Sequence, residues 1–193
     1  MIAKTVHIIN EKISENLDLF PCLKCYKLFG LAEHVVLRDS YSDRWIPYVI
    51  DRNSEDTDVW IDDDISLGIY HRLLSKNYST PERKSGYGDY TLQNVHADMI
   101  LVCWAFRKNF SGKSNVDTLE RLIYSSVVFN KGESQTIAVN SNFDRKSVFN
   151  GEFSGVPFNL PEDVMLFSMR YKIIYPVTTQ DCTVIENICK DGE

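Results

Sequence analysis

The stretch that decides the fold is Met-Ile-Leu-Val-Cys-Trp-Ala-Phe, residues 99–106. Neither set of alternating positions in it is polar, which is typical of a central strand covered on both faces of its sheet. A polar loop follows at 109–114, and residues 117–127 then resume apolar side chains at helical spacing: Leu119, Leu122, Ile123 and Val127. Residues 89–128 are therefore expected to form a buried strand followed by an amphipathic helix, the centre of a layered core.

Size and composition favour a single domain. The chain has 193 residues, of which 44% are hydrophobic and 25% are charged. These values are ordinary for a globular protein, and the length suffices to bury a substantial core. We expect one domain over residues 1–193, with an acidic loop excursion at 51–64 and a poorly anchored tail at 178–193.

The charge distribution argues against direct nucleic-acid binding. The formal net charge is −6, and the 21 Lys and Arg residues are spread along the chain, whereas phosphate contacts need a concentrated basic patch. No apolar run approaches the roughly 20 residues of a membrane span, and residues 1–17 lack the apolar segment of a signal peptide. We therefore expect no membrane association, a cytoplasmic location and, in a reducing compartment, cysteines that need not pair.

Hydrophobic periodicity predicts the other elements. Residues 1–17 carry apolar side chains at intervals of three and four, as in a helix packed on a sheet. Two or three strands are expected within residues 24–51, including 35–37 and 45–50, and further strands at 65–74, 135–139 and 164–177. In the last of them one parity, from Met165 to Tyr175, is apolar, while Ser168, Arg170 and Lys172 make the other face wetter.

The predicted fold class is α+β, with a mixed or antiparallel sheet, an N-terminal helix and a second helix packed on it. Pro47 is expected to place its strand at an edge, or to limit it to pairing on one side, because proline donates no backbone hydrogen bond. Long polar loops are expected at 75–89 and 140–161, and loops of such length are usually functional or mobile.

Cys22 and Cys25 form the sharpest local motif, Pro-Cys-x-x-Cys, which matches half of the zinc deaminase signature. The other half requires a Glu shortly after an upstream His or Cys, and His7 has no Glu at that spacing. A structural zinc site needs a second ligand pair, and Cys182 and Cys189 have neither the spacing nor a nearby His. We therefore expect ordinary cysteines, with no metal site and no cofactor.

Catalytic motifs are not found. The carboxylates of residues 51–64 are hard oxygen ligands, but the spacing and the glycine of a calcium-binding loop are missing, so this stretch is expected to face water. The four histidines are scattered, and no hydrolase, metalloprotease, phosphate-loop or dinucleotide motif is present. We expect a protein that is not an enzyme, with no catalytic residue.

Aromatic side chains in the long polar loops are the candidate interface. Exposed aromatic groups are costly unless something covers them, and partner surfaces are enriched in them. The alternative is that the loops fold back on their own domain. The candidate interface residues are Tyr78, Tyr87, Tyr90, Phe143, Phe149 and Phe153.

The order of elements, with a helix, strands, a long polar loop, a central apolar strand, an amphipathic helix and a closing strand, resembles the small tail-terminator, or tail-completion, proteins of long-tailed bacteriophages and prophages. In that family a strand like 97–106 leads into a helix like 116–127, and a late strand like 164–175 completes the sheet. The resemblance rests on element order and not on signature residues. It implies a virion protein that assembles as a ring, hexameric in the family, and it implies no catalytic residues. The acidic stretch at 51–64 is larger than the family would have.

Three hypotheses follow. The first is a non-enzymatic structural or assembly protein of a phage tail or neck, which self-associates through loops 75–90 and 140–161 and binds other tail or neck proteins, first in the host cytoplasm and then in the virion. The second is a small intracellular protein-binding or ligand-binding module that uses the same aromatic residues. The third is a zinc-dependent or cysteine-dependent enzyme that uses Cys22, Cys25 or the acidic loop.

Overall fold

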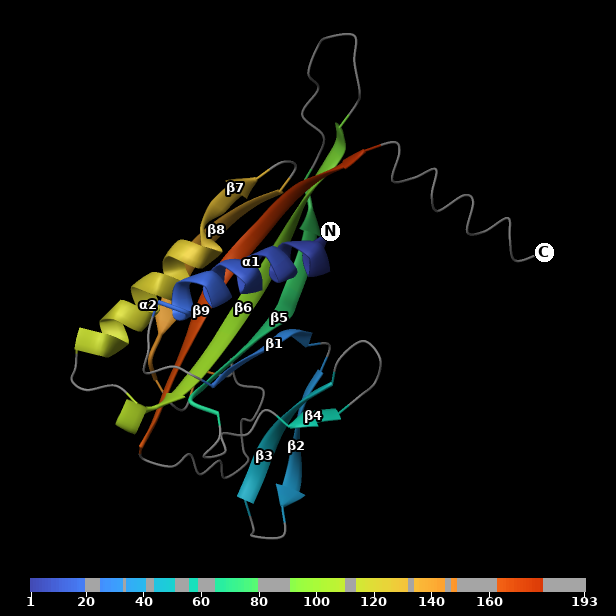
Figure 1. The fold of residues 1–193 in the computed structure, drawn as a ribbon. Coiled ribbons are helices and arrows are strands. Elements are labelled where there is room, and N and C mark those ends of the chain that lie inside the picture. The colour runs from blue at the N-terminus through green and yellow to red at the C-terminus, as the bar shows by residue number, and fades with distance from the viewer. Residues whose placement is uncertain are drawn as a thin grey trace.

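The computed structural model describes residues 1–19, 25–32, 34–40, 44–50, 56–58, 65–79, 91–109, 114–131, 134–144, 147–148 and 163–178. Within them, two α-helices cover one face of a six-stranded sheet, and a three-stranded sheet lies below it in the view of Figure 1. The predicted α+β class, with an N-terminal helix and a second helix packed on a sheet, is confirmed.

The main sheet has the strand order β1-β5-β6-β9-β8-β7. Its strands are β1 (Tyr26–Ala32), β5 (Leu67–Tyr78), β6 (Thr91–Phe106), β9 (Val164–Thr178), β8 (Ser134–Asn142) and β7 (Phe129–Lys131). The helices are α1 (Ile2–Leu17) and α2 (Ser114–Val127), and a 3-10 turn, Arg107–Asn109, follows β6. The sheet is mixed because β1 runs parallel to β5, whereas every other pair of neighbouring strands in it is antiparallel.

Strand β6 is covered on both faces, as its sequence predicts. One set of alternating residues joins a core that includes both helices, here called the helix-side core: Met99, Leu101, Cys103 and Ala105. The other set joins a smaller core on the opposite face, here called the far-side core: Ile100, Val102, Trp104 and Phe106. The strand is thus buried between two apolar layers, which explains why neither parity is polar.

Helix α1 buries the apolar stripe that its periodicity predicts. Ile9, Ile13 and Leu17 are completely buried in the helix-side core. Asn16 Nδ2 of α1 donates a hydrogen bond of 2.8 Å to Ser126 Oγ of α2. This bond joins the two helices side by side above the sheet (Figure 1).

Strand β9 confirms the predicted apolar face and corrects the other one. The residues from Met165 to Tyr175 on one parity are buried, and Arg170 and Lys172 are exposed on the other, as expected. Ser168 is buried, which contradicts the expectation of a wetter position. The reason is that the far-side core extends over this half of the strand, through Val164 and Leu166.

Two main-sheet strands are longer than predicted. β5 continues to Tyr78 and β8 continues to Asn142. The prediction of loops at 75–89 and 140–161 is therefore wrong for residues 75–78 and 140–142, which belong to strands. The added residues are mostly polar and hydrogen-bond through their backbone to β6 and β9, so side-chain periodicity does not reveal them.

The three-stranded sheet has the order β2-β3-β4, with β2 at His34–Ser40, β3 at Arg44–Ile50 and β4 at Asp56–Asp58. β3 is its middle strand, so the placement of Pro47 on an edge strand is wrong. However, β4 pairs only with Tyr48, Val49 and Ile50. Pro47 itself pairs with Leu37 on one side, which agrees with the one-sided alternative and with the missing N–H of proline.

The acidic stretch is not a loop throughout. Residues 56–58 form β4, which contradicts the expected loop excursion at 51–64 in its middle. The physical reason is that the edge of β3 offers unpaired backbone groups, and pairing with them outweighs the low strand propensity of aspartate. The rest of the acidic stretch, and the expected tail after Thr178, lie outside the described residues.

Candidate functional site

The candidate site is the outer edge of β8. β9 pairs with β8 from Gln135 to Asn142, whereas β7 pairs with it only at residues 134–136. Among the described residues, the outer edge of β8 has no strand partner from 137 to 142. An unpaired edge presents a row of backbone N–H and C=O groups that a strand of another molecule can pair with.

Large apolar side chains lie along this edge. Ile137 is 42% exposed, Val139 is 57% exposed and Phe143, just after the strand, is 48% exposed. We call these three residues the β8 patch. The register shifts between Ala138 and Asn140, so Val139 is the extra residue of a bulge. The Phe143 ring also contacts Phe167, with 5.7 Å between the ring centroids. Phe143 therefore lies on the helix-side face of the sheet, whereas Ile137, which pairs with Lys172, lies on the opposite face.

Strand β8 is uncharged. Its sequence is Ser-Gln-Thr-Ile-Ala-Val-Asn-Ser-Asn. Edge strands of monomeric proteins are usually protected by lysine, proline or a bulge, and of these devices β8 has only the bulge at Val139. A second strand can thus approach without meeting a charged side chain of β8.

A buried threonine holds β8 in position. Thr136 Oγ1 accepts a hydrogen bond of 3.0 Å from the backbone N–H of Phe129 and donates a short one to the carbonyl oxygen of Val127. These bonds connect the end of α2 and the start of β7 to the first half of β8. The open edge at residues 137–142 therefore follows a part of β8 that these bonds hold in place.

The structure describes two of the six predicted interface residues, Tyr78 and Phe143. Tyr78 is 58% exposed at the end of β5, and Lys76 Nζ lies 5.2 Å from the centroid of its ring. Phe143 is exposed as expected, while Tyr87, Tyr90, Phe149 and Phe153 lie outside the described residues.

The structure does not bring Tyr78 and Phe143 together. Tyr78 pairs with Val95 of β6, which in turn pairs with Tyr175 of β9. Phe143 instead contacts Phe167 of β9. The distance between these two β9 residues is about 26 Å at roughly 3.3 Å per residue. The two exposed aromatic residues therefore belong to opposite ends of the sheet and do not form one surface.

A buried polar cluster lies between α1 and the sheet. His71 of β5 is completely buried, its Nδ1 lies 2.8 Å from Tyr171 Oη, and its Nε2 lies 2.9 Å from Asn10 Oδ1. These partners are satisfied if Nε2–H donates to Asn10 and Tyr171 donates to Nδ1. Burial lowers the pKa of His71 to about 3 and raises the pKa of Tyr171. The cluster thus binds α1 to β5 and β9 in a neutral state.

The two cysteines that the structure describes lie in different environments. Cys25 is exposed, whereas Cys103 is buried in β6, where burial raises the pKa of its thiol. Cys22 lies outside the described residues. Within the described part of the chain, no group of three or more His, Cys, Asp or Glu side chains is arranged to hold a metal ion.

Comparison of the chain with models of known protein families gives no match, and comparison with curated proteins gives none either. Neither helix in the described part of the chain has the length and apolar character needed to cross a bilayer.

Sequence reasoning missed Ile137 and Val139. It selected aromatic residues in loops, whereas these two are aliphatic residues on a strand. The signal that points to them is the uncharged composition of residues 134–142, in which the short apolar run 137–139 stands between polar residues.

Proposed function

We propose that this protein is a non-enzymatic structural or assembly protein of a phage or prophage tail or neck. It acts by self-association and by contacts with other tail or neck proteins, first in the host cytoplasm and then in the virion. The resemblance in element order motivates the phage assignment. The open edge of β8 with its exposed patch is the observation that supports self-association.

The physical argument rests on strand addition. A strand placed beside residues 137–142 gains backbone hydrogen bonds and buries Ile137 and Val139, which are exposed in the single chain. Copies of a chain with net charge −6 repel one another. Contact through an uncharged strand avoids close pairs of like charges at the interface itself, so β8 is the favoured place for it.

The geometry of the contact decides the kind of assembly. Two β8 edges that face each other produce a twofold dimer, because the same surface is used on both copies. A ring requires β8 of one copy to meet a different surface of the next. The family resemblance favours the ring.

Charge placed on the β8 patch is expected to break the assembly. We expect the double variant Ile137→Lys/Val139→Lys to raise the dissociation constant at least about tenfold, because a buried unpaired charge costs more than about 1.4 kcal/mol. Size-exclusion chromatography with light scattering over a range of protein concentrations measures this change. Wild-type protein is expected to form an oligomer that the variant lacks.

Tyr124→Lys is the matched control. Tyr124 is 50% exposed on α2, so this substitution also places a lysine at an exposed apolar position, but on the helix layer. It is expected to leave the oligomer intact, and circular dichroism checks that all variants fold. A wild-type protein that stays monomeric at every concentration, or a double variant that assembles as well as wild type, would count against self-association through β8.

The phage assignment has a separate test. Genes for portal, tail-tube or capsid proteins next to the coding sequence would support it. A neighbourhood of metabolic genes, with no structural virion gene, would contradict it.

A further inference from the structure

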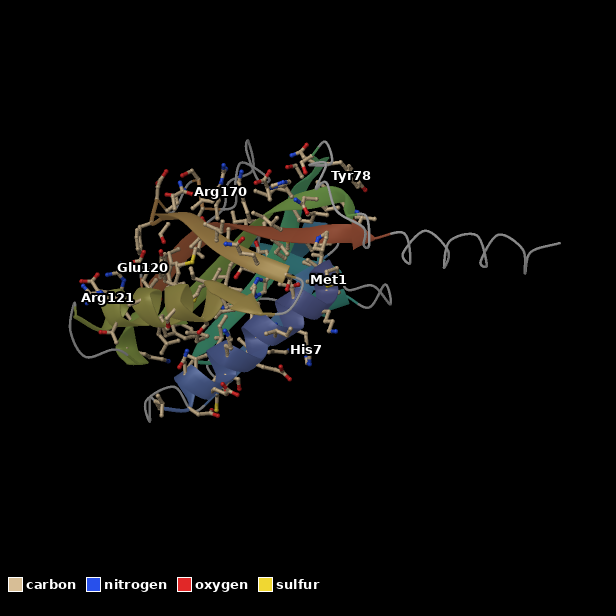
Figure 2. The ribbon with its side chains drawn as sticks, turned by 90° about the horizontal axis from the view of Figure 1, so that it is seen from above. Met1, His7, Tyr78, Glu120, Arg121 and Arg170 are labelled. Carbon is tan, nitrogen blue, oxygen red and sulfur yellow. The ribbon has the colours of Figure 1, made fainter. Side chains whose placement is uncertain are left out.

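The β8 patch has members on both faces of the main sheet. Ile137 pairs with Lys172 and so lies on the same face as Arg170. Figure 2 shows Arg170 on the opposite side of the sheet from His7, which projects from α1. Phe143 lies on the helix side, in contact with the helix-side core. Only an element in the plane of the sheet contacts both faces of an edge, so the partner of β8 contributes a strand.

The room for that strand has a defined length. β7 pairs with β8 up to Thr136, and β8 ends at Asn142. Beyond it the chain turns, because the backbone N–H of Asp144 donates a hydrogen bond of 2.9 Å to Asn142 Oδ1. An incoming strand therefore pairs with residues 137–142.

A second copy of β8 is a poor fit for this edge. If two copies paired antiparallel over the whole of 137–142, Val139 of each would face Asn140 of the other at the centre. Val139 is the extra residue of a bulge. The two bulges would thus meet in the middle of the contact, where each interrupts the row of backbone hydrogen bonds. A regular edge without a bulge fits better.

Other strand edges can be compared by length and by the devices that protect them. In the part of the chain that the structure describes, β1, β7, β2 and β4 each have an outer edge without a strand partner. β7 and β4 have three residues each, and two of those in β4 are aspartates. β1 has an exposed lysine, Lys27, and its register shifts around Gly30, whose φ is +74°. A lysine and an irregularity of this kind protect an edge against pairing, which leaves β2.

β2 matches the open edge of β8 in length, regularity and charge. All seven of its residues, His34–Ser40, pair with β3 without a register shift. Residues 35–37 are Val-Val-Leu, and the two β-branched valines favour extended structure. The charges of Arg38 and Asp39 cancel, so β2 brings no net charge to the uncharged β8. Copies of a chain with net charge −6 can thus meet there without a net repulsion between the two strands.

β2 and β8 lie on different sides of the molecule. The main sheet has β1 at one edge and β7 with β8 at the other, and β2 begins two residues after β1 ends. Figure 1 shows the three-stranded sheet on the β1 side, away from β7. A contact between two different surfaces joins copies head to tail, which is the arrangement that a ring requires.

We propose that β8 of one copy pairs with β2 of the next through backbone hydrogen bonds. The three-stranded sheet of one copy then extends the main sheet of its neighbour. This inference rests on the proposed self-association through β8 and names the surface that β8 meets.

Amide hydrogen exchange in the wild-type protein tests the pairing. We expect the outward-facing amides of both 137–142 and 34–40 to exchange at least about tenfold more slowly in the oligomer than after dilution to monomer. The amides of β4, at the other edge of the three-stranded sheet, are the internal control and should exchange equally fast in both states. Protection at 137–142 without protection at 34–40 would overturn the role of β2 and leave the β8 contact intact. No protection in either range, or a protein that never assembles, would overturn both proposals.

Cross-linking identifies the paired strands directly. Copies carrying Asn140→Cys are mixed with copies carrying Arg38→Cys, treated with a short bis-maleimide and analysed by peptide mapping. Neighbouring strands lie about 5 Å apart, so we expect links between positions 140 and 38. Thr57→Cys in β4 is the matched control and should not be linked to position 140. Links between two copies of position 140, in place of links to position 38, would show a twofold β8 contact and overturn the inference.

Discussion

Replacing Gly68 by alanine is expected to lower the free energy of unfolding by about 3 kcal/mol. Gly68 of β5 pairs directly with Trp104 of β6, and the indole ring lies over its Cα, so that an added Cβ would overlap ring atoms Cζ2, Cε2 and Cη2. Trp104 is only 4% exposed and stacks on Phe29 with 5.5 Å between ring centroids. Because the ring is buried and stacked in this way, relieving the overlap must displace side chains of the far-side core. Urea denaturation measures the loss.

Two further variants isolate the clash. Gly30→Ala is the matched control: its φ of +74° strains any other residue, but an added Cβ meets no atom within 4 Å, so it should cost only about 1 kcal/mol. In a Trp104→Leu background, Gly68→Ala should cost much less than in wild type, because the two changes are coupled. Equal costs in the two backgrounds would mean that the ring is not the obstacle.

Acid is expected to destabilise the fold through His71. In the unfolded chain its imidazole takes up a proton near pH 6.5, but burial lowers the pKa of His71 in the folded protein to about 3. Between these values the unfolded state binds more protons, so the free energy of unfolding falls as the pH falls through this window and is unaffected above it. The slope is about 1.4 kcal/mol per pH unit for one proton, and the total is several kcal/mol.

Comparison with His71→Gln isolates this effect. Other titrating groups contribute similarly to both proteins, so the difference between their unfolding free energies reports on the imidazole alone. Denaturation curves at several values between pH 4 and 8 should show the wild type losing its advantage as the pH falls. Parallel profiles for the two proteins would contradict a neutral, buried His71.

The sequence predicts those parts of the fold that depend on local periodicity. Residues 99–106 are apolar at every position, and the structure buries both faces of β6. The stripe ending in Ile13 and Leu17 predicts the buried face of α1, and the alternation from Met165 to Tyr175 predicts the helix-side face of β9. In each case the side chains in contact with the core repeat with the period of the element.

Features set by distant parts of the chain escape such reasoning. Ser168 lies on the polar parity of β9, but the far-side core covers it. β4 forms from acidic residues because β3 lies beside them. The exposure of Ile137 depends on how far β7 extends along β8, which no local pattern encodes. Sequence reasoning therefore places the candidate interface in aromatic loops, while the described structure exposes an aliphatic strand edge.

The most direct test of the central claim is amide hydrogen exchange at residues 137–142, measured at high and low protein concentration. If β8 is the contact between copies, its outward-facing amides exchange slowly in the oligomer and quickly after dilution to monomer. The contradictory result would be an oligomer, detected by light scattering, in which exchange at these amides is equally fast at both concentrations.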